Sequence, residues 1–240
     1  MPGAYHPAMK NTLMAWTLAA LIGTVQAGTI QLAVTDRDGK PVPDVVVLVE
    51  VAGKAAAQPA AAPVTIVQED LRFVPFLTVV PVGTTLRFVN RDSYDHHVRS
   101  TPSGPLGNTP SVKNIELRLD GSQAAAAPGG NDEYKAAPAP RKRSGSSTAD
   151  VKVDQPGAIG LGCHIHSSMR GQVYVSATPW FAKTDANGVA SIDGVPEGAA
   201  EISLWHPDQL QEQPTLRVQI SATPLKASGQ LNFTPRRRRS

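Results

Sequence analysis

One short segment gathers several side chains that bind soft metals. Residues 163–169 read CHIHSSM, so a thiolate, two imidazoles and a thioether fall within seven residues. Sulfur and imidazole together suit a metal with soft character, copper above all. A trigonal plane of one thiolate and two imidazoles needs a further histidine from elsewhere in the chain, and His96 and His97 are the candidates.

Cys163 is the only cysteine of the chain, so it cannot form an internal disulfide. The alternatives are an inert buried thiol, an intermolecular disulfide and a metal ligand. Taken singly, Cys163, His166 and Met169 are each at least as readily explained by ordinary packing or exposure. Their occurrence on one tight loop between two expected strands favours the metal site. His164 is expected to point outward, and His206, before a proline, is expected to be structural or exposed.

Two stretches resemble the cupredoxins, the blue copper proteins that include plastocyanin and amicyanin. Residues 90–98, NRDSYDHHV, are similar to the family's segment of Asn, five residues, His, Asn and Val. Residues 163–175 are similar to its ending of Cys, two residues, His, and then Met, Gly and alternating valines. The short His-to-Met spacing is that of the amicyanins. Bacterial cupredoxins of the methylamine-utilisation or plastocyanin-like type also resemble the chain, at residues 73–75, 79–85, 90–92, 96–98, 162–163 and 204–207. The resemblance covers roughly residues 62–178.

The resemblance implies one type 1 copper ion with His96, Cys163 and His166 as strong ligands and Met169 as the weak axial ligand. His97 falls where relatives often have Asn, a position that usually ties the ligand loops together. The implied function is single-electron transfer with an exported dehydrogenase or c-type cytochrome, without catalysis by the chain itself. Copper storage or delivery is the alternative function. A multicopper oxidase is disfavoured because Gly162, rather than His, precedes Cys163 and no paired H-x-H motifs occur elsewhere.

Short β-branched and alternating runs separated by Gly and Pro turns predict an all-β protein, and the resemblance implies a Greek-key cupredoxin sandwich over residues 62–178. Residues 28–56 and 179–225 resemble the two halves of a small carboxypeptidase-regulatory-like (transthyretin-like) β-sandwich. The cupredoxin domain is then inserted between these halves. This organisation predicts direct pairing between strands near Leu32 or Val47 and strands near Ile202.

The remaining segments are expected to lie outside the folded domains. Residues 1–27 read as a signal peptide cleaved after Ala27, which predicts a periplasmic or otherwise exported protein without a membrane span after cleavage. The alternative, a membrane anchor, is disfavoured because the apolar run is shorter than the roughly 20 residues of a spanning helix. The chain is expected to be a monomer. Residues 121–149 are expected to form a mobile insert, and residues 226–240 a disordered basic tail. Basic runs at 141–143 and 236–239, inside these two segments, hold seven of the 23 basic residues. The rest of the chain therefore has an acidic excess, and nothing favours nucleic-acid binding.

Overall fold

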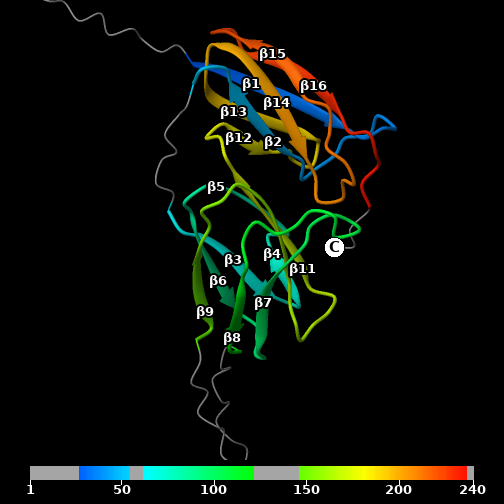
Figure 1. Cartoon of the computed structure of the whole chain (residues 1–240). Helices are drawn as coiled ribbons and strands as arrows, with labels where there is room; N and C mark the ends of the chain where they lie inside the picture. The colour runs from blue at the N-terminus through cyan, green and yellow to red at the C-terminus, as the bar shows by residue number, and fades with distance from the viewer. Residues whose placement is uncertain (1–26, 55–61, 122–145, 237–240) are drawn as a thin grey trace, which may run out of the picture.

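The computed structural model describes residues 27–54, 62–121 and 146–236. The elements of these residues are all β-strands, β1 to β16, so the all-β prediction is confirmed. The strands build two β-sandwiches, a small one in the upper half of Figure 1 and a large one below it. No helix long and apolar enough to cross a bilayer occurs in the described part of the chain.

The small sandwich combines strands from both ends of the chain. One sheet has the order β13-β1-β16 and the other has the order β12-β2-β14-β15. Alternating burial along β1 turns Ile30, Leu32 and Val34 into the core between these sheets. The strands are β1 (Ala27–Thr35), β2 (Val46–Val51), β12 (Phe181–Lys183), β13 (Val189–Pro196), β14 (Gly198–Trp205), β15 (Leu216–Ile220) and β16 (Leu225–Gln230).

The pairing of β2 with β14 joins the segments that precede and follow the large sandwich. Val49 lies opposite Ile202, and Val47 lies opposite Leu204. The predicted pairing near Val47 and Ile202 is therefore confirmed. The large sandwich is an insertion between β2 and β12, which themselves pair in antiparallel fashion.

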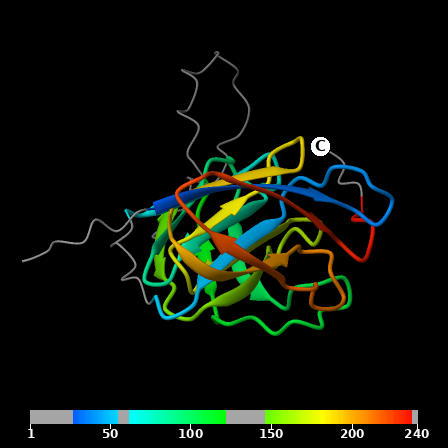
Figure 2. The same ribbon diagram turned by 90° about the horizontal axis from the view of Figure 1, so that it is seen from above.

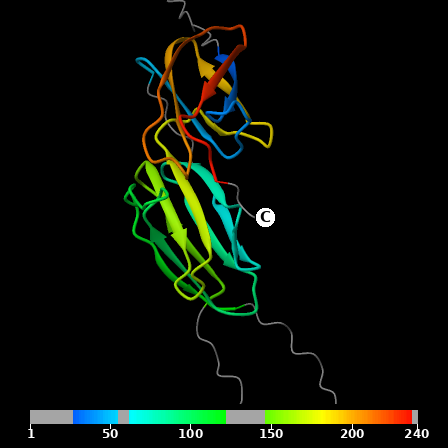
Figure 3. The same ribbon diagram turned by 90° about the vertical axis from the view of Figure 1, so that its right-hand side faces the viewer.

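The large sandwich packs a five-stranded sheet, in the order β5-β11-β10-β7-β8, on a four-stranded sheet, in the order β4-β3-β6-β9. Figure 3 shows the two layers side by side. Its core includes Phe88, Ile159 and Val173, all fully buried. The strands are β3 (Val64–Glu69), β4 (Arg72–Val74), β5 (Leu77–Pro81), β6 (Thr85–Asn90), β7 (His96–Thr101), β8 (Glu116–Leu119), β9 (Thr148–Lys152), β10 (Gly157–Gly162) and β11 (Arg170–Ser176).

A separate apolar cluster joins the two sandwiches, which overlap when the molecule is viewed from above in Figure 2. Leu77 and Ala158 of the large sandwich pack with Val46 and Trp205 of the small one. The Trp205 ring also lies 4.8 Å, centroid to centroid, from the ring of Tyr174. Ala158 is at the beginning of β10, whereas Cys163, a candidate metal ligand, follows the end of that strand. The candidate metal site is thus at the end of β10 remote from this contact.

Two of the expected unstructured segments are partly ordered. Within residues 121–149, Gly121 is buried and Thr148 and Ala149 belong to β9, which pairs with β6 and completes the four-stranded sheet. Within residues 226–240, most of β16 lies in the expected tail and pairs in parallel with β1, and Leu231 is fully buried. The sequence signal of β16 is weak because, apart from Leu225, its residues are small or polar.

Several other expectations fall largely outside the described residues. These are the signal peptide over residues 1–27, apart from Ala27, the central part of the insert and the last four residues of the basic tail. The exact domain boundaries stay predictions.

Removing the indole of Trp205 should destabilise the contact between the sandwiches. Trp205 is only 7% exposed, and replacing a buried Trp by Ala costs about 3–5 kcal/mol of the free energy of unfolding. Trp205→Ala should therefore lower the midpoint of chemical unfolding, followed by circular dichroism. Ile165→Ala, at a side chain that is 50% exposed, is the control and should change the midpoint little. An unchanged midpoint in Trp205→Ala would contradict the assigned contact.

Candidate metal centre

Strand register brings the predicted ligand loops to one end of the large sandwich. The β10–β11 hairpin has Gly162 opposite Arg170 as its last pair, so Cys163 and Met169 face each other where the hairpin opens. On the other side of β10, Gly162 lies opposite Arg99 of β7, the strand that begins at His96. The central position of β10 between β7 and β11 therefore gathers donors that are far apart in sequence.

Three donor atoms converge at this end. The sulfur of Cys163 lies 3.7 Å from Nδ1 of His96 and 3.6 Å from Nδ1 of His166. The two Nδ1 atoms are 3.1 Å apart. Cys163 and His96 are buried, and His166 is partly exposed. The geometry groups the three residues that the sequence predicts as strong ligands.

The size of this triangle fits a metal ion. A point equidistant from three atoms with these separations lies about 2 Å from each, and metal–imidazole bonds in proteins are about 2.0–2.1 Å long. One thiolate and two imidazoles make a donor set of borderline to soft character, which copper prefers. Two imidazole lone pairs and a sulfur at such short separations also repel one another unless a cation or a shared proton lies among them.

A carboxylate fixes the orientation of His96. Oδ2 of Asp92 lies 2.7 Å from Nε2 of His96, a side chain with no exposed surface. An ionised carboxylate only accepts hydrogen bonds, so Nε2 donates and the lone pair of Nδ1 faces the sulfur of Cys163. Carboxylates that hold the second nitrogen of a metal-binding histidine fix its tautomer and increase its basicity.

The same carboxylate holds the turn between β3 and β4. Its oxygens accept the backbone N–H groups of Asp70, at 2.9 Å, and Leu71, at 3.3 Å. Both turn residues have a positive φ. Burial of Asp92 opposes its ionisation, but the hydrogen bond from His96 and the two backbone N–H groups together hold its pKa below the ordinary value. In the sequence Asp92 lies four residues before His96, inside the segment that resembles the cupredoxins, but no role is predicted for it there.

The backbone of His97 binds the cysteine sulfur. Its N–H donates to Sγ of Cys163 at 3.4 Å, while its ring lies outside the cluster and stacks on that of His164. The structure therefore brings His96, rather than the ring of His97, to the sulfur. The expected tie between the ligand loops is present in the main chain.

Asn90 ties the His96 loop to its surroundings. Its Nδ2 donates to the carbonyl oxygens of Tyr94, at 2.8 Å, and Asp120, at 3.0 Å. Asn90 is buried, so these bonds are protected from water. The sequence marks this Asn as the end of a strand and as the first residue of the segment that resembles the cupredoxins.

Met169 lies beside the cluster, one hairpin turn after His166. Its side chain is 1% exposed, and its N–H donates to the carbonyl of His166 at 3.0 Å. This bond closes the loop that follows Cys163. The axial role of Met169 stays a prediction.

Tyr94 covers the two histidines from the solvent side and was missed by the sequence reasoning. Its ring meets those of His96 and His166 edge-on, with centroids 5.2 and 5.5 Å away. Burial, followed by the negative charge of Asp92, raises the pKa of Tyr94, so the phenol stays neutral at physiological pH. The aromatic edge restrains both rings without offering them a charged group.

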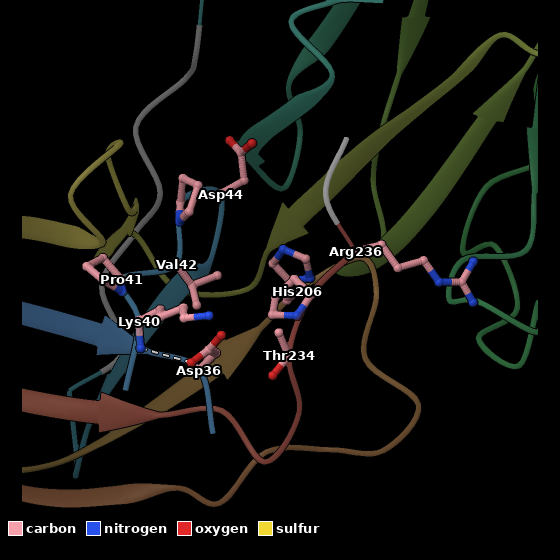
Figure 4. Close-up of a pocket in the computed structure, with 10 residues that line it drawn as sticks. Asp36, Lys40, Pro41, Val42, Asp44, His206, Thr234 and Arg236 are labelled. Carbon is pink, nitrogen blue, oxygen red and sulfur yellow. Dashed lines mark hydrogen bonds between the residues drawn. The ribbon is translucent and has the colours of Figure 1, made fainter. Parts of the chain in front are cut away.

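His206 is remote from this centre and has a structural role. It is nearly fully buried, and its Nδ1 accepts the N–H of Asp208 at 3.0 Å. It borders a cavity of about 490 Å³ in the small sandwich, opposite Asp36 and Lys40 in Figure 4. Of the two expectations for His206, structural or exposed, the structure favours the structural one.

Comparisons with known proteins give distant structural matches. A copper-containing nitrite reductase from Thermus scotoductus SA-01 matches with a TM-score of 0.35 and 18% identity, over 60% of this chain and 28% of that protein. A point mutant of amicyanin in its reduced Cu(I) form matches with a TM-score of 0.31 and 15% identity, over 53% of this chain and 98% of amicyanin. A purple cupredoxin from Nitrosopumilus maritimus matches with a TM-score of 0.31 and 19% identity, over 47% of this chain and 99% of that protein.

No family model matches the sequence, and a search of curated proteins finds no match. The structural matches are too distant to carry an argument, so the case for a metal site depends on the donor geometry. The large sandwich carries the ligand loops together at one end, as the resemblance noted in the sequence implies. The chain spans little more than a quarter of the nitrite reductase, and the activity of that enzyme is not transferred to it.

Replacing Asp92 by Asn should change the pH dependence of stability in the copper-free protein. The carboxylate has a depressed pKa in the folded state. Its contribution to the free energy of unfolding is therefore complete above the unfolded-state pKa of about 3.9. This contribution is lost as the pH falls through the folded-state pKa. The free energy of unfolding of Asp92→Asn should be roughly 1–2 kcal/mol lower than that of the parent protein at neutral pH, and this difference should shrink in acid.

The measurement is the free energy of unfolding by denaturant between about pH 2 and pH 7, a range that spans the carboxylate titration. Asp154→Asn is the control, because the Asp154 side chain is 60% exposed and forms only a surface pair with Lys113. A constant difference between Asp92→Asn and the parent at every pH would contradict the proposed charge effect.

Proposed function

We propose that this chain is an exported electron carrier that holds one type 1 copper ion. His96, Cys163 and His166 act as the strong ligands and Met169 acts as the axial ligand. The observation that carries this proposal is the convergence of a sulfur and two Nδ1 atoms, 3.1 to 3.7 Å apart, at one end of a rigid β-sandwich.

The surroundings of the cluster support electron transfer. Copper supplies the one-electron chemistry, and a thiolate with two imidazoles serves both of its oxidation states. Hydrogen bonds made by Asp92 and Asn90 hold the His96 loop, and one from the His97 main chain holds the sulfur of Cys163. A ligand set that moves little between oxidation states exchanges electrons with a small reorganisation cost.

The partly exposed ring of His166 is the natural contact for a redox partner. The neighbouring Ile165 and Tyr94 side chains are 50% and 39% exposed and form an apolar rim. Such a rim suits short-lived contact with another redox protein. We propose an exported dehydrogenase or a c-type cytochrome as the partner, with the chain acting as a monomer.

A visible and electron paramagnetic resonance spectrum of the copper-loaded chain tests the proposal. We expect an intense blue band from thiolate-to-copper charge transfer, with narrow copper hyperfine splitting. Cys163→Ala should lose the band, because it removes the sulfur. Ser168→Ala, in the same loop, should retain it. A colourless protein with full copper occupancy would reject the proposal.

The same sample separates electron transfer from copper storage or delivery. A carrier should pass through repeated reduction by ascorbate and reoxidation with its copper retained in the presence of a Cu(I) chelator. A storage or delivery protein should give up its copper to the chelator after the first reduction. Metal analysis after each cycle measures the difference.

Met169→Gln tests the axial ligand. An oxygen donor satisfies Cu(II) better than a thioether does, so the reduction potential should fall while the visible band persists in altered form. Protein-film or solution voltammetry measures the shift. Leu210→Gln, at a side chain that is 54% exposed, is the control and should leave the potential unchanged. An unchanged potential in Met169→Gln would remove Met169 from the ligand set.

A further inference from the structure

A buried glutamine connects the two sheets of the large sandwich close to the candidate metal centre. Gln68 is on β3, in the four-stranded sheet, and its side chain has no exposed surface. Its Nε2 donates to the carbonyl oxygen of His97, on β7 of the five-stranded sheet, at 3.2 Å. This hydrogen bond therefore crosses the core between the two layers seen in Figure 3.

The main chain of His97 lies beyond the end of the ladder between β7 and β10. The last pair of that ladder joins Arg99 to Gly162, and His97 precedes it by two residues. Side chains bind the main-chain groups of His97 here. The sulfur of Cys163 accepts its N–H at 3.4 Å, and Gln68 donates to its carbonyl oxygen. One residue is thus bound to the donor sulfur on one side and to the second sheet on the other.

Gln68 has a neighbour with a related task. In the parallel register of β3 and β6 it lies opposite Asn90, which is also buried. Asn90 binds the carbonyl oxygen of Tyr94, two residues before His96, whereas Gln68 binds that of the residue after His96. The two amides therefore restrain the chain on both sides of this candidate ligand.

The amide of Gln68 is an unfavourable choice for the stability of the core. Gln68 follows Ile66 on the inward face of β3, where apolar side chains are the rule. A carbonyl oxygen only accepts hydrogen bonds, so Nε2 faces His97 and Oε1 is turned away from it. Within the described residues Oε1 has no hydrogen-bond partner. An unpaired buried acceptor costs at least as much free energy as one neutral hydrogen bond gains, so stability does not explain this residue.

We propose that Gln68 is a positioning residue of the metal centre, which holds the His97 main chain so that its N–H stays on the sulfur of Cys163. This inference rests on the proposed electron-carrier function. A hydrogen bond to a ligating thiolate draws electron density from the sulfur and favours Cu(I) over Cu(II). Gln68 thereby raises the reduction potential from the opposite sheet, although it is not itself a ligand.

Gln68→Met is the test variant, because methionine is similar in length and lacks both the donor and the unpaired oxygen. Thr78→Val is the matched control. Oγ1 of Thr78 is the other buried side-chain oxygen or nitrogen without a partner in the described ranges, and valine has the same shape. Thr78 lies on β5, which β11 and β10 separate from β7.

The first test needs no copper. Amide hydrogen exchange is followed by ¹⁵N NMR in the copper-free full chain, with the thiol kept reduced. We expect the N–H of His97 to exchange severalfold faster in Gln68→Met than in the parent protein, and at the parent rate in Thr78→Val. The midpoint of chemical unfolding of Gln68→Met should be unchanged or higher. An unchanged exchange rate at His97, or a clear fall in that midpoint, would overturn the proposal.

The second test compares the reduction potentials of the copper-loaded proteins by voltammetry. At the parent's midpoint potential, Gln68→Met should have a severalfold lower ratio of Cu(I) to Cu(II), with its blue band retained. Thr78→Val should keep the parent's potential. An unchanged or higher potential in Gln68→Met, or equal shifts in both variants, would contradict the positioning role. A parent protein without a blue band would instead reject the proposed function, so the two failures are distinguishable.

Discussion

The close approach of three electron-rich atoms is the constraint on which the candidate site depends. The sulfur of Cys163 and the two Nδ1 atoms stand 3.1 to 3.7 Å apart, a separation that is unfavourable without positive charge among them. The fold must therefore hold these atoms against their mutual repulsion. It does so by placing β10 between the strand that begins with His96 and the strand that follows Met169.

The Asp92 carboxylate extends this restraint to a third part of the chain. Because it binds both the ring of His96 and the turn at Asp70 and Leu71, the β3–β4 hairpin becomes part of the support of the site. Leu71 is 40% exposed and holds a positive φ, which costs a branched residue some backbone energy. The bonds to Asp92 stabilise that conformation.

The sequence was sufficient for the donor residues and for the fold class, because both depend on local patterns. A thiolate, an imidazole and a thioether in one loop are visible as a string, and alternating residues such as Ile30, Leu32 and Val34 mark a strand directly. The contacts of Asp92 with Asp70 and Leu71, and of Tyr94 with His166, join separate loops, and no local pattern contains them. The strand β16 has little local signal because, apart from Leu225, its residues are small or polar and a basic run follows it closely.

The insertion also couples the two sandwiches in their folding. β2 and β12 pair directly, so the whole large sandwich is a long loop between two paired strands. When the large sandwich is folded, this loop is compact, and bringing its ends together costs less conformational entropy than it does for an unfolded loop. Any ion that binds the folded large sandwich more tightly than its unfolded chain shifts the equilibrium toward folding by mass action. The concentration of metal in the surrounding compartment would thereby influence the folded fraction of the small sandwich, although that sandwich holds none of the proposed ligands.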